Sequence, residues 1–273
     1  MKKITFLILI TFFVVVLSCQ SSDKRGDKKL ISIKTEFGEI KVRLYDETPE
    51  HKKNFLKLVN DGFYNDLLFH RVINHFMIQG GDPKSKDAQQ GVRLGGGSPG
   101  YTVPAEIIPK YYHKKGALAA ARKGGPSNPE KQSSGSQFYI IHGKIFRPGE
   151  IDTMIISKNN QFKNKLLKEK IKGASNELNE CRTNNDQQGF NIRVAEIREQ
   201  VDSIYDSNPK FAMSDEQIKD YITIGGYPSL DGEYTVFGEV VEGLDVLDKI
   251  AAVEVDKNNR PKTDVKMQVE LVK

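Results

Sequence analysis

The sequence predicts a mainly β protein: a closed antiparallel barrel whose ends are plugged by two helices, with a helical unit inserted late in the chain. Segments of alternating, β-branched and aromatic residues recur on both sides of that unit, and only two amphipathic helices accompany them. Between residues 144 and 226 the strand signals vanish and helical spacing replaces them, which indicates an insertion. The chain has 273 residues, 38% hydrophobic and 28% charged, which is typical of a globular protein.

The first eighteen residues have the order of a secretory signal peptide, with two lysines, an apolar run over residues 4–16 and a small residue before Cys19. The run is too short for a comfortable membrane-spanning helix. The cysteine resembles that of a bacterial lipoprotein, in which cleavage leaves a lipid-bearing thiol; the alternative is a signal peptide cut elsewhere. Residues 20–29 are polar throughout and predict a flexible tether. We therefore expect an exported protein, anchored by lipid to a bacterial membrane and facing the periplasm.

The charge balance gives no sign of a nucleic-acid partner. The formal net charge is +5, and removing residues 1–18, which hold two lysines and no acid, would leave +3. No basic cluster with interleaved aromatic residues accompanies this weak excess. If Cys19 is acylated, Cys181 is the only free thiol and no intrachain disulfide can form.

The folded part is expected to begin with two paired strands, residues 30–34 and 39–45, joined by a turn at 36–38. A helix should follow, because Thr48-Pro49-Glu50 combines an N-cap hydroxyl, a proline in the first turn and an acid. Phe55, Leu58 and Val59 should form the buried face of this helix, and Gly62 should end it.

The next stretch, Phe69 to Asp82, holds one arginine among apolar residues. Met77 and Gln79 share a face of a strand, and a bend over residues 73–75 would bring Arg71 beside them. A fixed cation beside an apolar wall can hold a polar amide. Taken alone, the arginine is better interpreted as a surface residue next to a core strand, and only the motifs further along the chain favour a binding role.

Loops and buried strands alternate after this stretch. The glycine-rich segment 95–101 lacks a nucleotide-binding pattern and is interpreted as a tight surface loop. The small residues of 116–121 would let another chain approach the backbone, as at a sheet edge that faces a ligand. A polar loop, 122–134, then precedes a buried strand over 135–141.

The inserted unit, 144–226, is expected to form two or three helices, the last beginning at the capping box 214–217. Strand character resumes over 234–240. A second amphipathic helix, 243–252, and an alternating strand, 265–271, complete the chain.

Four motifs in order resemble the cyclophilins, which are peptidyl-prolyl cis-trans isomerases. The resemblance implies a closed eight-stranded barrel formed by residues 30–143 and 227–273, and the insertion 144–226 has no counterpart in the minimal family fold. The motifs are Phe69-His70-Arg71 with Phe76-Met77-Ile78-Gln79-Gly80-Gly81-Asp82, Gly135-Ser136-Gln137-Phe138, Leu230-Asp231-Gly232, and Val236-Phe237-Gly238-Glu239-Val240.

Carried over position by position, the resemblance implies a prolyl pocket that needs no cofactor, nucleophile or metal. The implied catalytic residues are Arg71, Phe76 and Gln79. The implied substrate-binding residues are Met77, Gly95, Ala121, Arg122, Gln137, Tyr139, Leu230 and Tyr234.

The chain departs from the family pattern at four of these positions or beside them. The family usually has phenylalanine at Tyr139, histidine at Tyr234, asparagine at Arg122 and, in many members, tryptophan at Ser229. The added hydroxyl of Tyr139 must find a partner. Isomerase activity is expected to survive these changes, whereas cyclosporin sensitivity is not implied, because the missing tryptophan contributes to drug binding in the family.

The expected function is isomerisation of X-Pro bonds in exported proteins, with unfolded or extended proline-containing polypeptides as partners. The alternative is a client-binding chaperone or interaction module in which the helical insertion is the working part and the barrel a scaffold. A third interpretation is that the insertion is a tolerated surface elaboration. The sequence indicates neither the clients nor the oligomeric state.

Overall fold

The computed structural model describes residues 30–272, so the predicted signal peptide, Cys19 and the whole of the predicted tether lie outside the described residues. One antiparallel sheet of eight strands forms the body of the protein, in the order β10-β1-β2-β9-β6-β8-β4-β3. A two-stranded sheet, β5 with β7, lies beside it. The strands are β1 (Leu30–Thr35), β2 (Gly38–Leu44), β3 (Arg71–Ile73), β4 (Met77–Gly80), β5 (Thr102–Val103), β6 (Ala117–Ala120), β7 (Ser133–Ser134), β8 (Phe138–Ile141), β9 (Val236–Glu242) and β10 (Gln268–Leu271).

The predicted closed barrel is wrong, because the sheet is open between its edge strands β3 and β10. The two edges meet only through irregular backbone just before each strand. There, Leu68 forms an isolated bridge with Lys266, and the Phe69 amide donates to the Val265 carbonyl at 2.9 Å. Strands β3 and β10 do not pair with each other, so this contact does not continue into a ladder.

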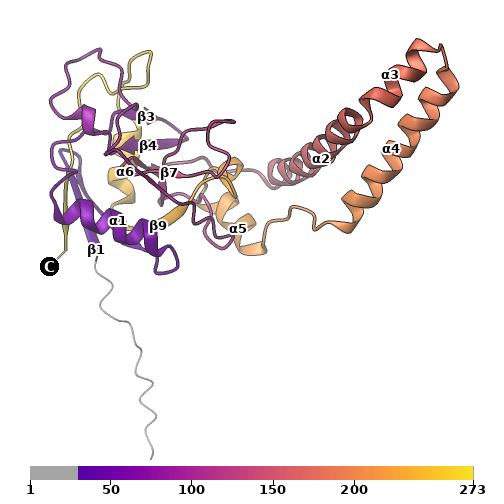
Figure 1. Ribbon diagram of the computed structural model, residues 1–273. Helices are drawn as coiled ribbons and strands as arrows, with labels where there is room; N and C mark the ends of the chain where they lie inside the picture. The colour runs from indigo at the N-terminus through magenta and orange to yellow at the C-terminus, as the bar shows by residue number, and fades with distance from the viewer. Residues whose placement is uncertain (1–29, 273) are drawn as a thin grey trace, which may run out of the picture.

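Helices α1 (Pro49–Asn60) and α6 (Leu244–Ala251) bury their apolar faces in the main core of the sheet (Figure 1). Helix α1 begins with proline in its first turn, as expected, and Gly62 adopts φ +64° just after it ends. Two short 3-10 helices, η1 (Pro83–Ser85) and η2 (Pro228–Leu230), belong to loops.

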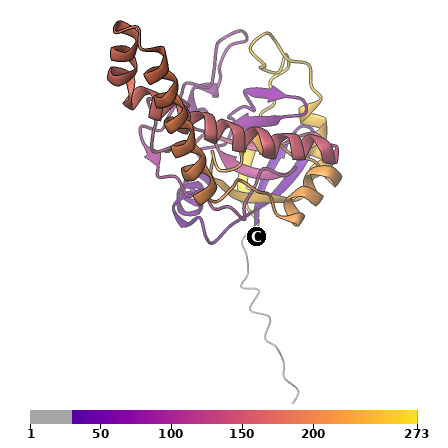
Figure 2. The same cartoon turned by 90° about the vertical axis from the view of Figure 1, so that its right-hand side faces the viewer.

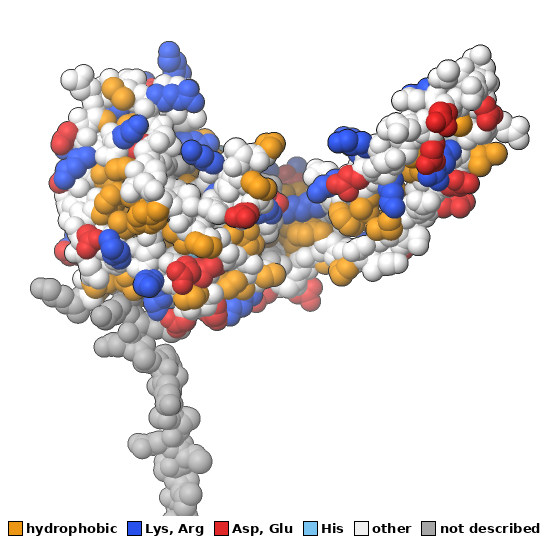
Figure 3. Space-filling view, viewed as in Figure 1, with side chains coloured by type: hydrophobic (Ala, Val, Ile, Leu, Met, Phe, Trp, Pro, Cys, Tyr) orange, Lys and Arg blue, Asp and Glu red, His pale blue; other side chains and the backbone are white. Residues whose placement is uncertain are grey.

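Between β8 and β9 the chain forms four helices, α2 (Pro148–Gly173), α3 (Ser175–Thr183), α4 (Gln187–Ser207) and α5 (Asp215–Thr223), where two or three were expected. Helices α2 to α4 project from the sheet as an arm, and α5 lies at the base of this arm (Figures 1 and 2). The arm has a small core of its own that includes Leu178 and Ile197. Side chains of both charge signs are scattered along it (Figure 3). No helix within residues 30–272 is both long and apolar enough to cross a bilayer.

Candidate active site

The β3–β4 hairpin places Arg71 where the sequence predicts it. Arg71 and Gln79 are paired across the hairpin, and the arginine Nη1 donates to the Gln79 Oε1 at 3.2 Å. His75, in the turn between the strands, has φ +59°, so the bend expected over residues 73–75 is present. The short hairpin therefore fixes the guanidinium against the amide.

The Arg71 guanidinium lies against an apolar wall. Its Nη1 is 3.8 Å from the Met77 sulfur, and its Cζ is 5.6 Å from the centre of the Phe76 ring, within cation–π range. Burial lowers the pKa of Arg71, but from so high an ordinary value that the group stays protonated at neutral pH. No carboxylate of the described chain forms an ion pair with it, so its charge is available to a ligand.

A cavity of about 120 Å³ opens at this guanidinium, room for one small ring. It is formed by the β3–β4 hairpin, the end of β6, strand β8 and the residues around η2. The structure brings nine of the predicted site residues together here: Arg71, Phe76, Met77, Gln79, Ala121, Arg122, Tyr139, Leu230 and Tyr234.

The other two predicted residues, Gly95 and Gln137, line a second cavity of about 330 Å³. Gln79, Ala121 and Arg122 are shared by both cavities, so the two are neighbours. The second cavity is lined mainly by glycines and polar residues, and it includes residues outside the predicted site: Gly96, Gly97, Ser98, Thr102, Lys123, Ser127, Asn128, Gln132 and Ser134. An extended peptide could place one residue in each cavity.

A line of amides connects the two cavities. The Gln79 Nε2 donates to the Gln137 Oε1 at 3.0 Å, and the Gln137 Nε2 donates to the carbonyls of Gly95 and Gly97 at 3.1 and 2.8 Å. Since each amide is both donor and acceptor, the orientation of one fixes that of the next.

The buried carboxylate of Asp82 holds the glycine loop in place. Its Oδ2 accepts from the backbone amides of Gly95 and Gly97 at 2.5 and 3.2 Å, and its Oδ1 accepts from the Lys84 amide at 2.8 Å. A Cβ at Gly97 would collide with this carboxylate, so the close approach requires glycine.

The buried hydroxyl of Tyr139 has a hydrogen-bond partner, the ring of His113, as its burial requires. The His113 Nε2 lies 3.0 Å from it, and the Nδ1 of the same ring lies 2.9 Å from the Asp231 Oδ1. A carboxylate can only accept, so Nδ1 carries a proton, and the Nε2 of a neutral ring accepts from the tyrosine. Burial raises the pKa of Tyr139 far above its ordinary value, which keeps this donor protonated. Sequence reasoning missed His113, for which no local pattern gave a signal.

Arg122, the second cation at the cavities, is already engaged. Its Nε donates to the Glu233 carbonyl at 2.9 Å, its Nη2 forms an ion pair with the Glu233 carboxylate at 3.1 Å, and its Cζ lies 4.5 Å from the centre of the Tyr234 ring. The arginine thus packs one wall of the pocket, whereas Arg71 faces the cavity without an anionic partner.

His70 makes the stability of this region depend on pH. The ring is 4% exposed, and desolvation lowers its pKa to about 4 although the nearby Asp82 opposes the shift. The unfolded chain, with an ordinary pKa, binds the proton first as the pH falls, so stability present above pH 6.5 is lost towards pH 4. We expect a loss of about 3 kcal/mol over this range, measured by urea unfolding. In His70→Gln the loss over the same range should shrink by that amount, and equal pH profiles would contradict the expectation.

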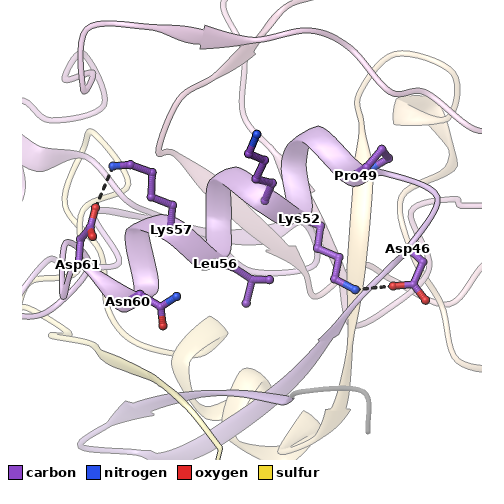
Figure 4. Close-up of a pocket in the computed structure, with 8 residues that line it drawn as sticks. Asp46, Pro49, Lys52, Leu56, Lys57, Asn60 and Asp61 are labelled. Atoms are coloured by element: carbon purple, nitrogen blue, oxygen red, sulfur yellow. Dashed lines mark hydrogen bonds and ion pairs between the residues drawn. The ribbon is translucent and has the colours of Figure 1, made fainter. Parts of the chain in front are cut away.

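A larger hollow, about 610 Å³, lies on the outer face of α1 (Figure 4). Two of its three lysines are tied to acidic neighbours, Lys57 to Asp61 at 2.9 Å and Lys52 to Asp46. It is an open surface around Leu56 and contains none of the predicted site residues. Within residues 30–272 no His, Cys, Asp and Glu side chains gather in a group of three or more that could hold a metal ion.

The fold and the pocket define a protein whose sheet carries a small cavity with a fixed cation against an apolar wall. Residues 30–155 and 212–270 match the family model described as "Cyclophilin type peptidyl-prolyl cis-trans isomerase/CLD". The chain therefore belongs to the cyclophilin-type peptidyl-prolyl cis-trans isomerase family, as the sequence predicted. The unmatched residues, 156–211, correspond to most of the helical arm.

Curated relatives agree with this assignment. The chain is 42% identical over 105 residues to peptidyl-prolyl cis-trans isomerase B of Bacillus subtilis strain 168, covering 38% of this chain and 64% of that protein. It is 40% identical over 111 residues to a peptidyl-prolyl cis-trans isomerase of Synechococcus elongatus, covering 40% and 66%. A longer Streptococcus pyogenes serotype M6 protein, whose name combines phosphatase with peptidyl-prolyl cis-trans isomerase, is 30% identical over 86% of this chain, which spans 37% of its length. The chain thus spans less than two thirds of each of these relatives.

Among solved structures, a cyclophilin type peptidyl-prolyl cis-trans isomerase of Cryptosporidium parvum has the same fold. It aligns with a TM-score of 0.51 and 20% sequence identity, covering 90% of this chain and 98% of its own. At this identity the likeness bears on the fold alone.

Proposed function

We propose that this protein catalyses cis-trans isomerisation of X-Pro bonds in extended polypeptides, with Arg71 as the donor that stabilises the twisted imide. The observation that carries the proposal is the guanidinium at the cavity, which pairs with no carboxylate of residues 30–272 and is held by Gln79 and backed by Phe76 and Met77. The pocket offers a place for one ring beside one fixed donor.

Isomerisation of an X-Pro bond requires little more than one fixed donor and an apolar pocket. Rotation about an X-Pro bond has a barrier of roughly 18 to 20 kcal/mol, because the planar amide is held by resonance. When the bond twists, the imide nitrogen regains its lone pair, so a donor near the imide binds the transition state better than the ground state. A charge-assisted hydrogen bond of about 1.5 to 3 kcal/mol would give roughly ten- to a hundredfold acceleration. The apolar wall strengthens that contact by excluding water.

We propose proline-containing segments of unfolded or extended polypeptides as the substrates. A cyclophilin of the same fold, 20% identical and with a TM-score of 0.50, was crystallised in the presence of the dipeptide Ala-Pro. The small side chain of Ala121 leaves room for a peptide backbone to pass from the prolyl cavity to the polar one. The test is an isomerisation assay with an Ala-Pro peptide: we expect the protein to accelerate the slow exchange, and an unchanged rate would contradict the proposal.

We further propose that the protein acts on exported proteins at the periplasmic side of a bacterial membrane, held there by lipid on Cys19. The basic start, the short apolar run and the small residue before Cys19 support this location.

Replacing Cys19 tests the anchor. In a bacterium fed a labelled fatty acid, we expect the wild type to be labelled and to sediment with membranes, whereas Cys19→Ala should be unlabelled and should not sediment. Cys181→Ala is the matched control and should behave as wild type, because Cys181 lies in α3. A Cys19→Ala protein that still carries label would contradict a lipid on this thiol.

A further inference from the structure

The helical unit is joined to the body of the protein directly beside the prolyl pocket. Its first and last residues pair with each other, since the Lys144 amide donates to the Gly226 carbonyl at 3.1 Å and the Gly226 amide donates to the Lys144 carbonyl at 3.0 Å. The chain then passes straight into η2, which carries Leu230. On the way, the Tyr227 ring packs against Phe76, with ring centres 4.3 Å apart. Two pocket residues are therefore in, or in contact with, the short segment that follows the helices.

A lysine of helix α2 forms two hydrogen bonds with this segment. The Lys158 ammonium donates to the carbonyls of Pro228 and Asp231, at 3.3 and 3.2 Å. These two carbonyls flank Leu230 in the chain, so one side chain from the arm fastens both sides of the pocket residue. Lys158 is half-buried, and burial lowers its pKa; its ammonium also lies 4.3 Å from the centre of the Phe211 ring.

Helix α5 reaches the floor of the pocket through a buried chain of hydrogen bonds. The Tyr221 hydroxyl donates to the Asp231 Oδ2 at 2.6 Å. The other carboxylate oxygen of Asp231 accepts from the His113 amide and lies against the His113 ring, both at 2.9 Å. The far side of that ring meets the Tyr139 hydroxyl at 3.0 Å. Tyr221 is fully buried, and burial raises its pKa far above the ordinary value, so it remains a donor.

We propose that helices α2 and α5 are positioning elements for the prolyl pocket: Lys158 holds the segment that carries Leu230, and Tyr221, through Asp231 and His113, sets the ring of Tyr139. This inference rests on the proposed function. It gives the helical unit a part in the reaction that needs no contact between the arm and the substrate.

The proposal predicts which kinetic constant changes. Leu230 and Tyr139 form apolar walls that would hold the proline ring in the planar and the twisted states alike, so disturbing them removes uniform binding. Uniform binding lowers KM without raising kcat. Loss of a positioning contact should therefore raise KM and leave kcat close to wild type.

The first test removes one oxygen atom. In Tyr221→Phe the ring still fills its site while Asp231 loses a donor, and we expect KM for an Ala-Pro peptide to rise roughly tenfold with kcat unchanged. Tyr112→Phe is the matched control, because the Tyr112 hydroxyl also donates to an aspartate, Asp220 of α5, at 2.6 Å. Its ring packs edge-on against Tyr221, but its hydroxyl does not donate to Asp231. Both changes remove a tyrosine–aspartate bond at the base of the arm, and only Tyr221→Phe should change KM.

The second test does not touch the buried tyrosines. Lys158→Met keeps the length of the side chain and removes the ammonium, so we expect the same rise in KM. Lys163→Met is its control, since Lys163 lies farther along α2 and pairs with Asp202 of α4 at 2.6 Å. If Tyr221→Phe fails to fold, the comparison of Lys158→Met with Lys163→Met still tests the positioning proposal.

The outcomes separate the two proposals. Positioning by the helices is supported if the wild type is active, KM is raised in both Tyr221→Phe and Lys158→Met, and both controls stay near wild type. An active wild type whose KM is unchanged in Tyr221→Phe and Lys158→Met, or is raised equally in the controls, overturns the positioning proposal and leaves the proposed function standing. A wild type without isomerase activity overturns the proposed function, and positioning of a prolyl pocket falls with it.

Discussion

Arg71→Ala is expected to lower kcat/KM for a proline-containing peptide by roughly ten- to a hundredfold. The guanidinium is the one cation at the cavity that has no carboxylate partner among residues 30–272, whereas Arg122 is occupied by Glu233. Its removal deletes the donor that would bind the twisted imide more strongly than the planar one, so kcat should fall together with kcat/KM. The measurement is the rate of cis-trans exchange at increasing peptide concentration.

Arg71→Lys separates charge from geometry. Lysine keeps the charge, but it replaces a planar fork of five donors by a point charge on a flexible stem, so we expect activity between those of the wild type and Arg71→Ala. Unfolding in urea is the check on structure. Arg71 is only partly buried, and its guanidinium donates to the Gln79 Oε1 and more weakly to the Met77 sulfur, so the free energy of unfolding should change little. Unchanged isomerisation in a folded Arg71→Ala protein would contradict the proposed mechanism.

Much of this site could be predicted from the sequence because its parts are locally encoded. Alternation over residues 39–45 identified β2, and the Thr48-Pro49 start identified α1. The pairing of Arg71 with Gln79 follows from a hairpin of ten residues. Where local patterns were silent, the resemblance of four motifs supplied the other predicted site residues, each of which lines one of the two cavities.

The parts that were missed depend on contacts between distant segments. Whether an eight-stranded sheet closes is decided by the pairing of β3 with β10, and nothing within Arg71–Ile73 encodes that outcome. The helix α3 was not anticipated because only the break at Ala174 separates it from α2. His113 gave no signal, since its partner Asp231 is 118 residues away in the chain.

The second large effect is expected at Arg260, which is 2% exposed and joins two loops on the side of the protein near Gly95. Its Nε and Nη2 form a bidentate pair with Asp264, at 3.0 and 2.8 Å. The same guanidinium donates to three carbonyls of the loop that follows η1, those of Ala88, Gln89 and Val92. We expect Arg260→Ala to lower the free energy of unfolding by about 3 to 5 kcal/mol, because it removes a buried guanidinium and leaves a carboxylate and three loop carbonyls without their donor. Urea unfolding measures this loss.

Lys262→Ala is the matched control for burial. Lys262 lies two residues further on and pairs with Glu254 at 2.9 Å, but both side chains are exposed, so water replaces the lost partner and the change should stay below about 1 kcal/mol. A similar loss of unfolding free energy in the two variants would contradict this prediction, since it would mean that burial adds nothing at Arg260.

The loop that Arg260 holds, 88–92, leads directly into the glycine loop that Asp82 holds. A partly unfolded Arg260→Ala protein should therefore lose peptide binding at the polar cavity before it loses the sheet, because the hairpin that carries Arg71 is held by its own ladder.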